Sequence, residues 1–172
     1  MIAWNGQGFD RRLGKGYGEM QTLNTAIDRL AADWSDNDWV VKCNGRYRVP
    51  SAPVFCRHLK SLNKVSLVAD MTRNLTWCDS RFFAARLNCW RSHILPRGGG
   101  VDDSARMYFE HVLARSAHAL MAEGGQFDLL PYMPSIHGVS GSMGHNYFSP
   151  RSFFRHKLKA LLYPLKRAAF RV

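Results

Sequence analysis

The sequence predicts an α/β fold in which a small sheet is flanked by helices, followed by a C-terminal amphipathic basic helix. Segments with helical spacing of apolar residues alternate with short apolar runs. The hydrophobic fraction of 46% and the aromatic fraction of 12% are typical of a globular chain with a buried core. Residues 151–172 contain seven basic residues and no acidic ones. We therefore expect an α/β domain over residues 1–150 and a basic tail over residues 151–172.

The first half of the domain is expected to alternate helices and strands. Residues 1–18 are rich in glycine and lack periodicity, which predicts a loop. Apolar residues at helical spacing predict a helix over Glu19–Ala32, and an apolar run predicts a short buried strand over Asp38–Lys42. Val54–Leu62 is expected to form a second helix. β-branched residues predict a second strand over Lys64–Ala69.

The second half is expected to contain more helix than strand. Asn74–Leu87 is aromatic and predicted to be largely buried, and Pro96–Gly100 is predicted to be a loop. Acidic and hydroxyl residues at its start predict a long helix over Asp102–Ala122, which two glycines end. Residues 126–150 are expected to hold a short strand and then the Gly138–Gly144 loop. The tail is expected to be a helix interrupted by Pro164.

The charge of the chain indicates a polyanionic partner. The formal net charge is +11, of which the seven basic residues of 151–172 supply +7 and leave +4 for the rest. This uneven distribution argues against nucleic acid as the partner. The tail also carries an apolar stripe that favours an anionic membrane surface over packing against the domain, although packing remains the alternative. The stripe consists of Phe154, Leu158, Leu161, Leu162 and Leu165.

The cysteines indicate neither a zinc site nor a redox motif. Cys43, Cys56, Cys78 and Cys89 include no C-x-x-C pair and are expected to be small core residues. No apolar run reaches the length of a membrane span, and no leading segment has the pattern of a signal peptide. These observations predict a reducing, cytoplasmic compartment, with the tail allowing a peripheral position on the inner face of the membrane.

A pair of cations follows the first predicted strand. Lys42, Gly45, Arg46 and Tyr47 come directly after the apolar run, and ligands of open α/β folds bind at the carboxyl edge of the sheet. Two neighbouring cations repel unless an anion lies between them, so a phosphate or diphosphate is the expected ligand. Tyr47 is expected to stack on a ring or pack over a sugar. The alternative is a solvated strand end that discourages edge-to-edge pairing.

A glycine segment opens the first predicted helix. Lys15, Gly16, Gly18 and Glu19 would let the backbone approach an anion at the helix N-terminus. The alternative is that the glycines only shape a connection, with Glu19 interacting favourably with the helix dipole.

Further candidates follow the second predicted strand and precede the long helix. Asp70 should lie on the same sheet edge as Lys42, and the substrate contacts expected nearby are Asp70, Asn74, Trp77 and Arg81. The general bases considered are Asp79, Asp102, Asp103 and Glu110. The alternatives are a local Asp79–Arg81 ion pair, helix capping by Asp102 and Asp103, and a solvent-facing Glu110.

A loop of small residues ends the domain. Gly138, Ser140, Gly141 and His145 belong to a segment that can lie against a bulky ligand, and they are expected to contact substrate. The segment lacks the Gly-Lys-Ser/Thr of a Walker loop and the G-x-S-x-G spacing of a nucleophile elbow. Ser140 is therefore not expected to be a nucleophile.

Taken together, these motifs resemble those of bacterial glycosyltransferase-like proteins of surface-polysaccharide biosynthesis. In that group a "KGxGE" helix precedes a strand that ends "K-x-x-GRY", as Lys15–Glu19 and Lys42–Tyr47 do here. The likeness continues through Trp77–Arg81, the helix around Glu110 and the Gly138–Gly141 loop, and spans about residues 14–147.

The resemblance implies a small GT-A-like, Rossmann-like domain that uses a nucleotide-sugar donor and a glycan acceptor. In the GT-A type an Asp-x-Asp at the end of the strand holds a divalent metal, whereas this sequence has Lys42 to Arg46 there. Fixed cations are therefore expected to neutralise the diphosphate, with metal dependence left open. Asp102 or Asp103 resembles the acceptor-activating carboxylate of that type.

The first strands and nucleotide-binding loop of the GT-A type are expected before the glycine segment, and the sequence shows none there. Three interpretations of the chain stay open: it is a truncated relative of the group, a fragment, or a protein that keeps only acceptor binding. The rival expectation is a non-catalytic, basic protein that binds phosphates, nucleic acid or membranes, or an inactive remnant of a transferase.

Overall fold

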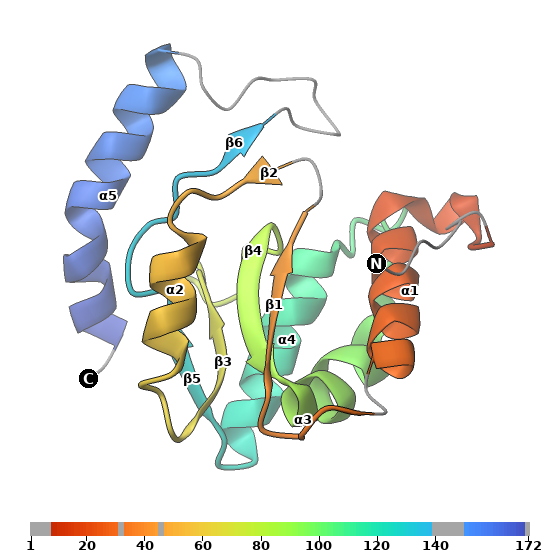
Figure 1. Cartoon of the computed structure of the whole chain (residues 1–172). Coiled ribbons are helices and arrows are strands. Elements are labelled where there is room, and N and C mark those ends of the chain that lie inside the picture. The colour runs from red at the N-terminus through yellow and green to blue at the C-terminus, as the bar shows by residue number, and fades with distance from the viewer. Residues whose placement is uncertain (1–7, 31–32, 45–46, 139–149, 171–172) are drawn as a thin grey trace.

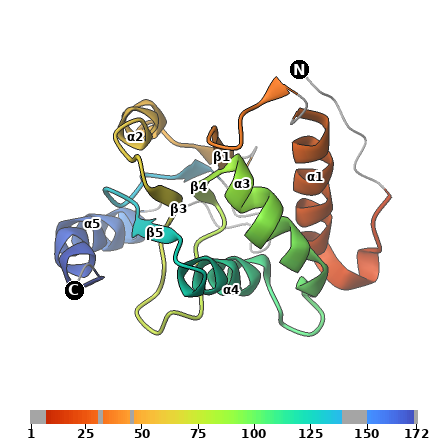
Figure 2. The same cartoon turned by 90° about the horizontal axis from the view of Figure 1, so that it is seen from below.

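The computed structural model of the 172-residue chain describes residues 8–30, 33–44, 47–138 and 150–170. A four-stranded sheet lies between two layers of helices (Figures 1 and 2). The α/β class and the flanking helices are confirmed. A C-terminal helix is present as expected, and it lies along the outside of the domain in Figure 1.

Three strands of the main sheet point in the same direction. The order is β1-β4-β3-β5, formed by β1 (Trp39–Cys43), β4 (Phe82–Arg86), β3 (Val65–Ala69) and β5 (Gln126–Leu129). β4 is antiparallel to both β1 and β3, and β5 is parallel to β3. The carboxyl ends of β1, β3 and β5 therefore meet at one edge of the sheet, where β4 begins. A second, two-stranded sheet pairs β2 (Tyr47–Arg48) with β6 (His137–Gly138).

Two helical layers cover the sheet. On one face lie α1 (Gly14–Leu30), α4 (Phe109–Ala122) and a continuous helical stretch, and on the other lie α2 (Ala52–Leu59) and α5 (Pro150–Phe170). The continuous stretch consists of α3 (Leu87–Cys89), the π-helix η3 (Trp90–Ile94) and the 3₁₀ helix η4 (Leu95–Gly100).

The strand β4 was not predicted as a strand. Phe82, Phe83, Ala84 and Ala85 are all buried because helices cover both faces, so the sequence shows no alternation of apolar and polar residues. Phe83 stacks on Trp90 with ring centroids 5.2 Å apart, in the cluster under α1 and α4. Phe82 packs on the other face against Phe55 of α2, with centroids 4.9 Å apart.

Several predicted boundaries were wrong. Residues 11–18 are helical, since the 3₁₀ helix η1 (Arg11–Leu13) leads into α1. The predicted loop over Pro96–Gly100 is part of η4. The long helix begins at Phe109, because Asp102 and Met107 form an isolated bridge across a tight turn in which Arg106 is left-handed at φ 58°.

The tail helix docks on the domain by one face and exposes the other. Tyr163, Lys166, Arg167 and Phe170 face the domain at i, i+3, i+4 and i+7 spacing. α5 continues through Pro164, so the predicted interruption was wrong. Along the part of the chain that the structure describes, no helix is both long enough and apolar enough to cross a bilayer.

Candidate functional site

The predicted site residues gather at the carboxyl edge of the main sheet. Lys42 lies near the end of β1, and Asp70 directly follows β3, so the expectation that they share an edge is confirmed. Residues 78–81 lead into β4 at the same edge, and the N-terminus of α4 approaches it from one face. The backbone N–H of Cys78 donates to the carbonyl of Glu110, at 3.1 Å, and ties this segment to α4.

Lys42 is buried and does not present its ammonium to solvent. Its side chain is 4% exposed, and Nζ pairs with Oε1 of Glu19 at 2.5 Å and donates to the carbonyl of Ser80. Nζ also lies 5.4 Å from the ring centroid of Phe109 and 6.0 Å from that of Phe83. The expectation that Lys42 and Glu19 bind a diphosphate is corrected: they neutralise each other and join β1 to α1.

The glycine segment contacts the protein itself. A Cβ on Gly16 would lie 2.6 Å from Oδ1 of Asp103, and one on Gly18 would lie 2.5 Å from the ring of Phe9. The N–H of Gly16 donates to Oδ2 of Asp103 at 2.9 Å. The N-terminus of this helix therefore interacts with the carboxylate of Asp103 and not with the ligand anion that was predicted. The prediction that Gly16 and Gly18 bind the donor is therefore corrected. Lys15, predicted to bind it as well, is exposed in the first turn of α1.

The two acids before the long helix have structural roles. Asp103 caps α1 across 87 residues of sequence, and its N–H donates to the carbonyl of Leu13. Oδ1 of Asp102 accepts from the hydroxyl and N–H of Ser104 and from the N–H of Ala105, and these hydrogen bonds lower the pKa of Asp102. The alternative that Asp103 caps the long helix is therefore wrong, because α4 begins at Phe109 and Asp103 caps α1 instead. Neither acid is placed to act as a general base at the sheet edge.

Glu110 and Asp79 remain as acids at the edge. Glu110 lies in the first turn of α4, and its Oε1 accepts from the hydroxyl of Ser80 at 2.8 Å. Asp79 holds Arg81 through two oxygens, with Nε to Oδ1 at 2.8 Å, and accepts from the N–H of Arg81. The local ion pair expected between Asp79 and Arg81 is confirmed. Ser80 was missed by sequence reasoning, because a lone serine carries no pattern.

Asp70 contacts the tail helix. Its carboxylate pairs with Lys166, and one strand away Asp128 of β5 pairs with Arg167 at 2.8 Å. The substrate contact expected of Asp70 is therefore corrected to a docking contact for α5. Burial raises the pKa of the Tyr163 phenol, which lies beside the same two carboxylates. These ion pairs could not be predicted from the sequence, because the two residues of each pair are far apart in the chain.

An aromatic cluster lies beside Glu110. The Trp77 ring meets His111 edge-on with centroids 4.9 Å apart and Tyr108 at 5.9 Å. Trp77 and His111 are half-buried, and Tyr108 is exposed. Asn74 shapes the preceding loop, where its Oδ1 accepts from the Thr72 hydroxyl at 2.7 Å. The sequence predicted Trp77 but missed Tyr108 and His111.

The small second sheet holds two more predicted residues. Tyr47 of β2 pairs with Gly138 of β6 in antiparallel register, and the N–H of Tyr47 donates to the carbonyl of Asn44 at 2.9 Å. In Figure 1 this two-stranded sheet lies beyond the end of β1. The other predicted contacts, Gly45, Arg46, Ser140, Gly141 and His145, lie outside the described residues.

Two of the cysteines are buried, and two are not. Cys78 and Cys89 lie in the core, whereas Cys43 and Cys56 are exposed, which corrects the expectation for the latter two. Burial raises the pKa of the Cys78 thiol well above its ordinary value, and the carboxylates of Asp70 and Asp79 add to the shift. Among the described residues, no group of three or more His, Cys, Asp or Glu side chains could hold a metal ion.

No protein-family model, curated protein or solved structure matches this chain in the comparisons made with known proteins.

Proposed function

We propose that this protein is a glycosyltransferase-like enzyme that transfers a sugar from a nucleotide-sugar donor to a polysaccharide or lipid-linked acceptor. The observation that supports it best is that Glu110, bound by Ser80, and Asp79, bound by Arg81, lie at the carboxyl edge of the sheet, where Trp77 and His111 of the aromatic cluster are their neighbours in sequence. Ligands of α/β sheets bind at this edge, and a site with carboxylates and an aromatic face fits a sugar. The GT-A-like assignment of the fold is part of the same proposal.

In this proposal Glu110 is the general base. The Ser80 hydroxyl orients its carboxylate through Oε1, and the carboxylate accepts the proton of the acceptor hydroxyl. The acceptor oxygen forms a bond to the anomeric carbon of the donor sugar while the bond from that carbon to the diphosphate oxygen breaks. The nucleoside diphosphate leaves with the electron pair.

Arg81 replaces Lys42 as the proposed cation for the leaving diphosphate. Its side chain is 29% exposed at the start of β4, and Asp79 fixes the direction of the guanidinium. A guanidinium can contact two phosphate oxygens at once. Lys42 acts indirectly, because it holds the Ser80 carbonyl next to the hydroxyl that orients Glu110.

The test uses UDP and GDP as probes in calorimetric titrations, followed by a panel of UDP- and GDP-sugars in a nucleotide-release assay. At least one diphosphate should bind, and Arg81→Gln should weaken it about tenfold. Glu110→Gln should keep that affinity and lower turnover by about 100-fold or more. Arg57→Gln and Glu123→Gln, exposed residues away from the edge, are the matched controls. Absence of binding by both probes would refute the transferase proposal.

The proposal includes attachment to an anionic membrane surface through α5. Leu158, Leu161, Leu162 and Leu165 lie on one face of the helix and are between 50% and 75% exposed. Lys157 and Lys159 are exposed on the same helix, and no acidic residue occurs in 151–172. An exposed leucine face with basic flanks fits the boundary between lipid headgroups and acyl chains. This face is also the observation that favours the alternative function, a non-catalytic membrane-binding protein.

Vesicle sedimentation tests the attachment. The protein should bind vesicles that contain anionic phosphatidylglycerol and bind pure phosphatidylcholine vesicles much less. The double variant Leu161→Ser/Leu165→Ser should lose most of the binding, whereas Val54→Ser, an exposed apolar residue of α2, should not. If the leucines instead mediate a dimer, the double variant will abolish concentration-dependent association in sedimentation equilibrium, and that result would refute the membrane role.

A further inference from the structure

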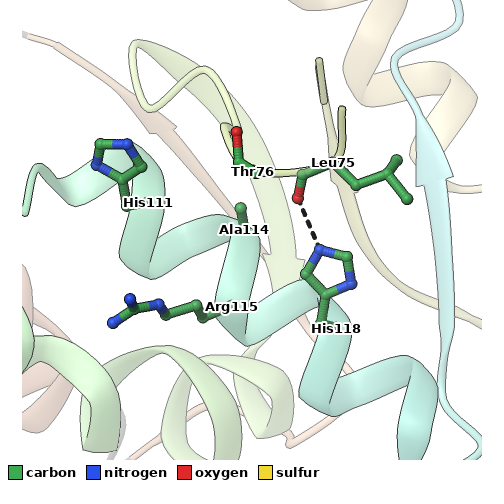
Figure 3. Close-up of a pocket in the computed structure, with 6 residues that line it drawn as sticks. All are labelled: Leu75, Thr76, His111, Ala114, Arg115 and His118. Atoms are coloured by element: carbon green, nitrogen blue, oxygen red, sulfur yellow. Dashed lines mark hydrogen bonds between the residues drawn. The ribbon is translucent and has the colours of Figure 1, made fainter. Parts of the chain in front are cut away.

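A cavity of about 410 Å³ lies between α4 and the loop that precedes the Trp77 segment. Figure 3 shows the backbone of Leu75 and Thr76 facing one side of α4, with Ala114 between His111 and His118. Arg115 completes the lining. The volume is within the range of cavities that hold small molecules and is sufficient for a monosaccharide unit.

The lining combines three basic side chains, two histidines and one arginine, with no acidic residue. Nδ1 of His111 accepts from the N–H of Tyr108 at 3.2 Å, so the ring proton of neutral His111 is on Nε2, where it can be donated to a ligand. Arg115 is exposed and adds a guanidinium, and Thr76 adds a hydroxyl. Leu75 and Ala114 supply apolar surface. The cavity therefore offers several donors and an apolar wall.

The loop over the cavity is held in an unfavourable conformation. Leu75 has φ 62°, in the left-handed region that a leucine rarely adopts, and its side chain is exposed. The carbonyl of Leu75 accepts from Nε2 of His118 at 2.7 Å, as the dashed line in Figure 3 marks. Such strain persists where surrounding contacts hold it, and it often marks a binding site. His118 thus fixes the loop wall while His111 and Arg115 remain as donors toward a ligand.

We propose that this cavity is a subsite for an anionic sugar unit of the acceptor, which carries a carboxylate or a phosphate. The inference rests on the proposed transferase function and assigns its acceptor chemistry. The Arg115 guanidinium would pair with the acidic group, His111 would donate a hydrogen bond, and the apolar wall would contact the sugar ring. Trp77, whose ring meets His111, and Glu110, which precedes His111 in α4, connect this cavity to the site at the sheet edge.

The test compares three monosaccharides by two-dimensional NMR titration of the full chain: glucuronate, glucose 6-phosphate and glucose. At least one of the two acids should shift the resonances of Thr76, His111 and Arg115 and should bind about tenfold more tightly than glucose. Whichever of glucuronate and glucose 6-phosphate binds more tightly identifies the natural acidic group as a carboxylate or a phosphate. Arg115→Gln should weaken the acid about tenfold, while Arg57→Gln, which removes the same charge from α2, should leave it unchanged.

Equal binding of glucose and the acids, or an Arg115→Gln variant with wild-type affinity, would overturn the subsite. Shifts confined to residues outside the cavity would overturn it as well. UDP and GDP titrations of the same samples separate this failure from failure of the transferase proposal, because the diphosphate site depends on Arg81 and not on Arg115. Thr76→Val, a substitution at an exposed position that leaves the net charge unchanged, should weaken binding of the acidic sugar by a smaller factor than Arg115→Gln.

Discussion

The ammonium of Lys42 lies inside the protein with Glu19 as its partner, so removing it should affect stability before anything else. Lys42→Met leaves the Glu19 carboxylate without its cation and removes a donor from the Ser80 carbonyl. We expect the free energy of unfolding to fall by about 2 kcal/mol in urea titrations, less than for a fully buried pair because Glu19 is 31% exposed.

A double variant separates loss of charge from loss of packing. Lys42→Met/Glu19→Leu replaces the ion pair by apolar contacts with Phe83 and Phe109 and should recover most of the lost stability. UDP affinity should be equal in the double variant and the wild type. A Lys42→Met variant with unchanged stability but no UDP binding would instead restore Lys42 as a diphosphate ligand.

The buried thiols predict a loss of stability at alkaline pH. Burial raises the pKa of Cys89 from 9.0 to about 12. Above pH 9 the unfolded chain releases the thiol proton while the folded chain keeps it, so stability falls as pH rises from 9 toward 12. Each such thiol contributes a slope of about 1.4 kcal/mol per pH unit. Urea unfolding at pH 8, 9 and 10 measures this slope.

Substitution of single cysteines assigns the effect. Cys89→Ala should reduce the slope of unfolding free energy against pH by the contribution of one thiol. Cys56→Ala, at an exposed position, should not change this slope. An unchanged slope in Cys89→Ala would mean that the folded protein ionises this thiol normally. At pH 8 a thiol reagent should modify Cys43 and Cys56 in the folded protein and reach the buried pair only in denaturant.

At the scale of elements, α5 is stable despite a proline in its interior. Pro164 has no N–H for the carbonyl of Ala160, and its ring crowds the preceding turn. The contacts of Tyr163, Lys166 and Arg167 with the domain offset this cost. Pro164→Ala should therefore raise the free energy of unfolding by about 1 to 3 kcal/mol and slow amide exchange throughout α5. Equal exchange in the two proteins would contradict a continuous helix.

The sequence predicted well the elements that have a recognisable local pattern. α1 and α2 follow from the helical spacing of apolar residues, β1 from an apolar run and β3 from its β-branched residues. β4 lacks such a pattern, since both of its faces are buried. The glycines of α1 were misinterpreted for a different reason: they make room for Asp103 and Phe9, which are placed there by the tertiary fold. Local sequence does not contain that information.

At the scale of the whole molecule, strand order predicted which residues share a sheet edge, whereas the role of each residue depended on its partner in the folded structure. The shared edge of Lys42 and Asp70 follows from strand order. Their partners, Glu19 and Lys166, come from helices at opposite ends of the chain, so neither pair could be inferred from spacing. Glu110 and Trp77 keep candidate roles because their neighbours leave them partly exposed at the edge.

The distribution of charge over the molecule predicts which basic residues matter for membrane attachment. Attraction to an anionic surface is worth about 1 kcal/mol for each basic residue near it, and it falls off within a Debye length. Lys157→Gln/Lys159→Gln removes two charges from α5, whereas Arg57→Gln/Lys60→Gln removes two from α2 and its C-cap and gives the same net charge. If the leucine face meets the lipid, the α5 variant should bind phosphatidylglycerol vesicles about 30-fold more weakly, and the α2 variant should change much less. Raising the salt concentration should weaken the wild type more than the α5 variant. Equal losses in the two variants would mean that net charge alone attracts the protein, and α5 would then have no special role at the membrane.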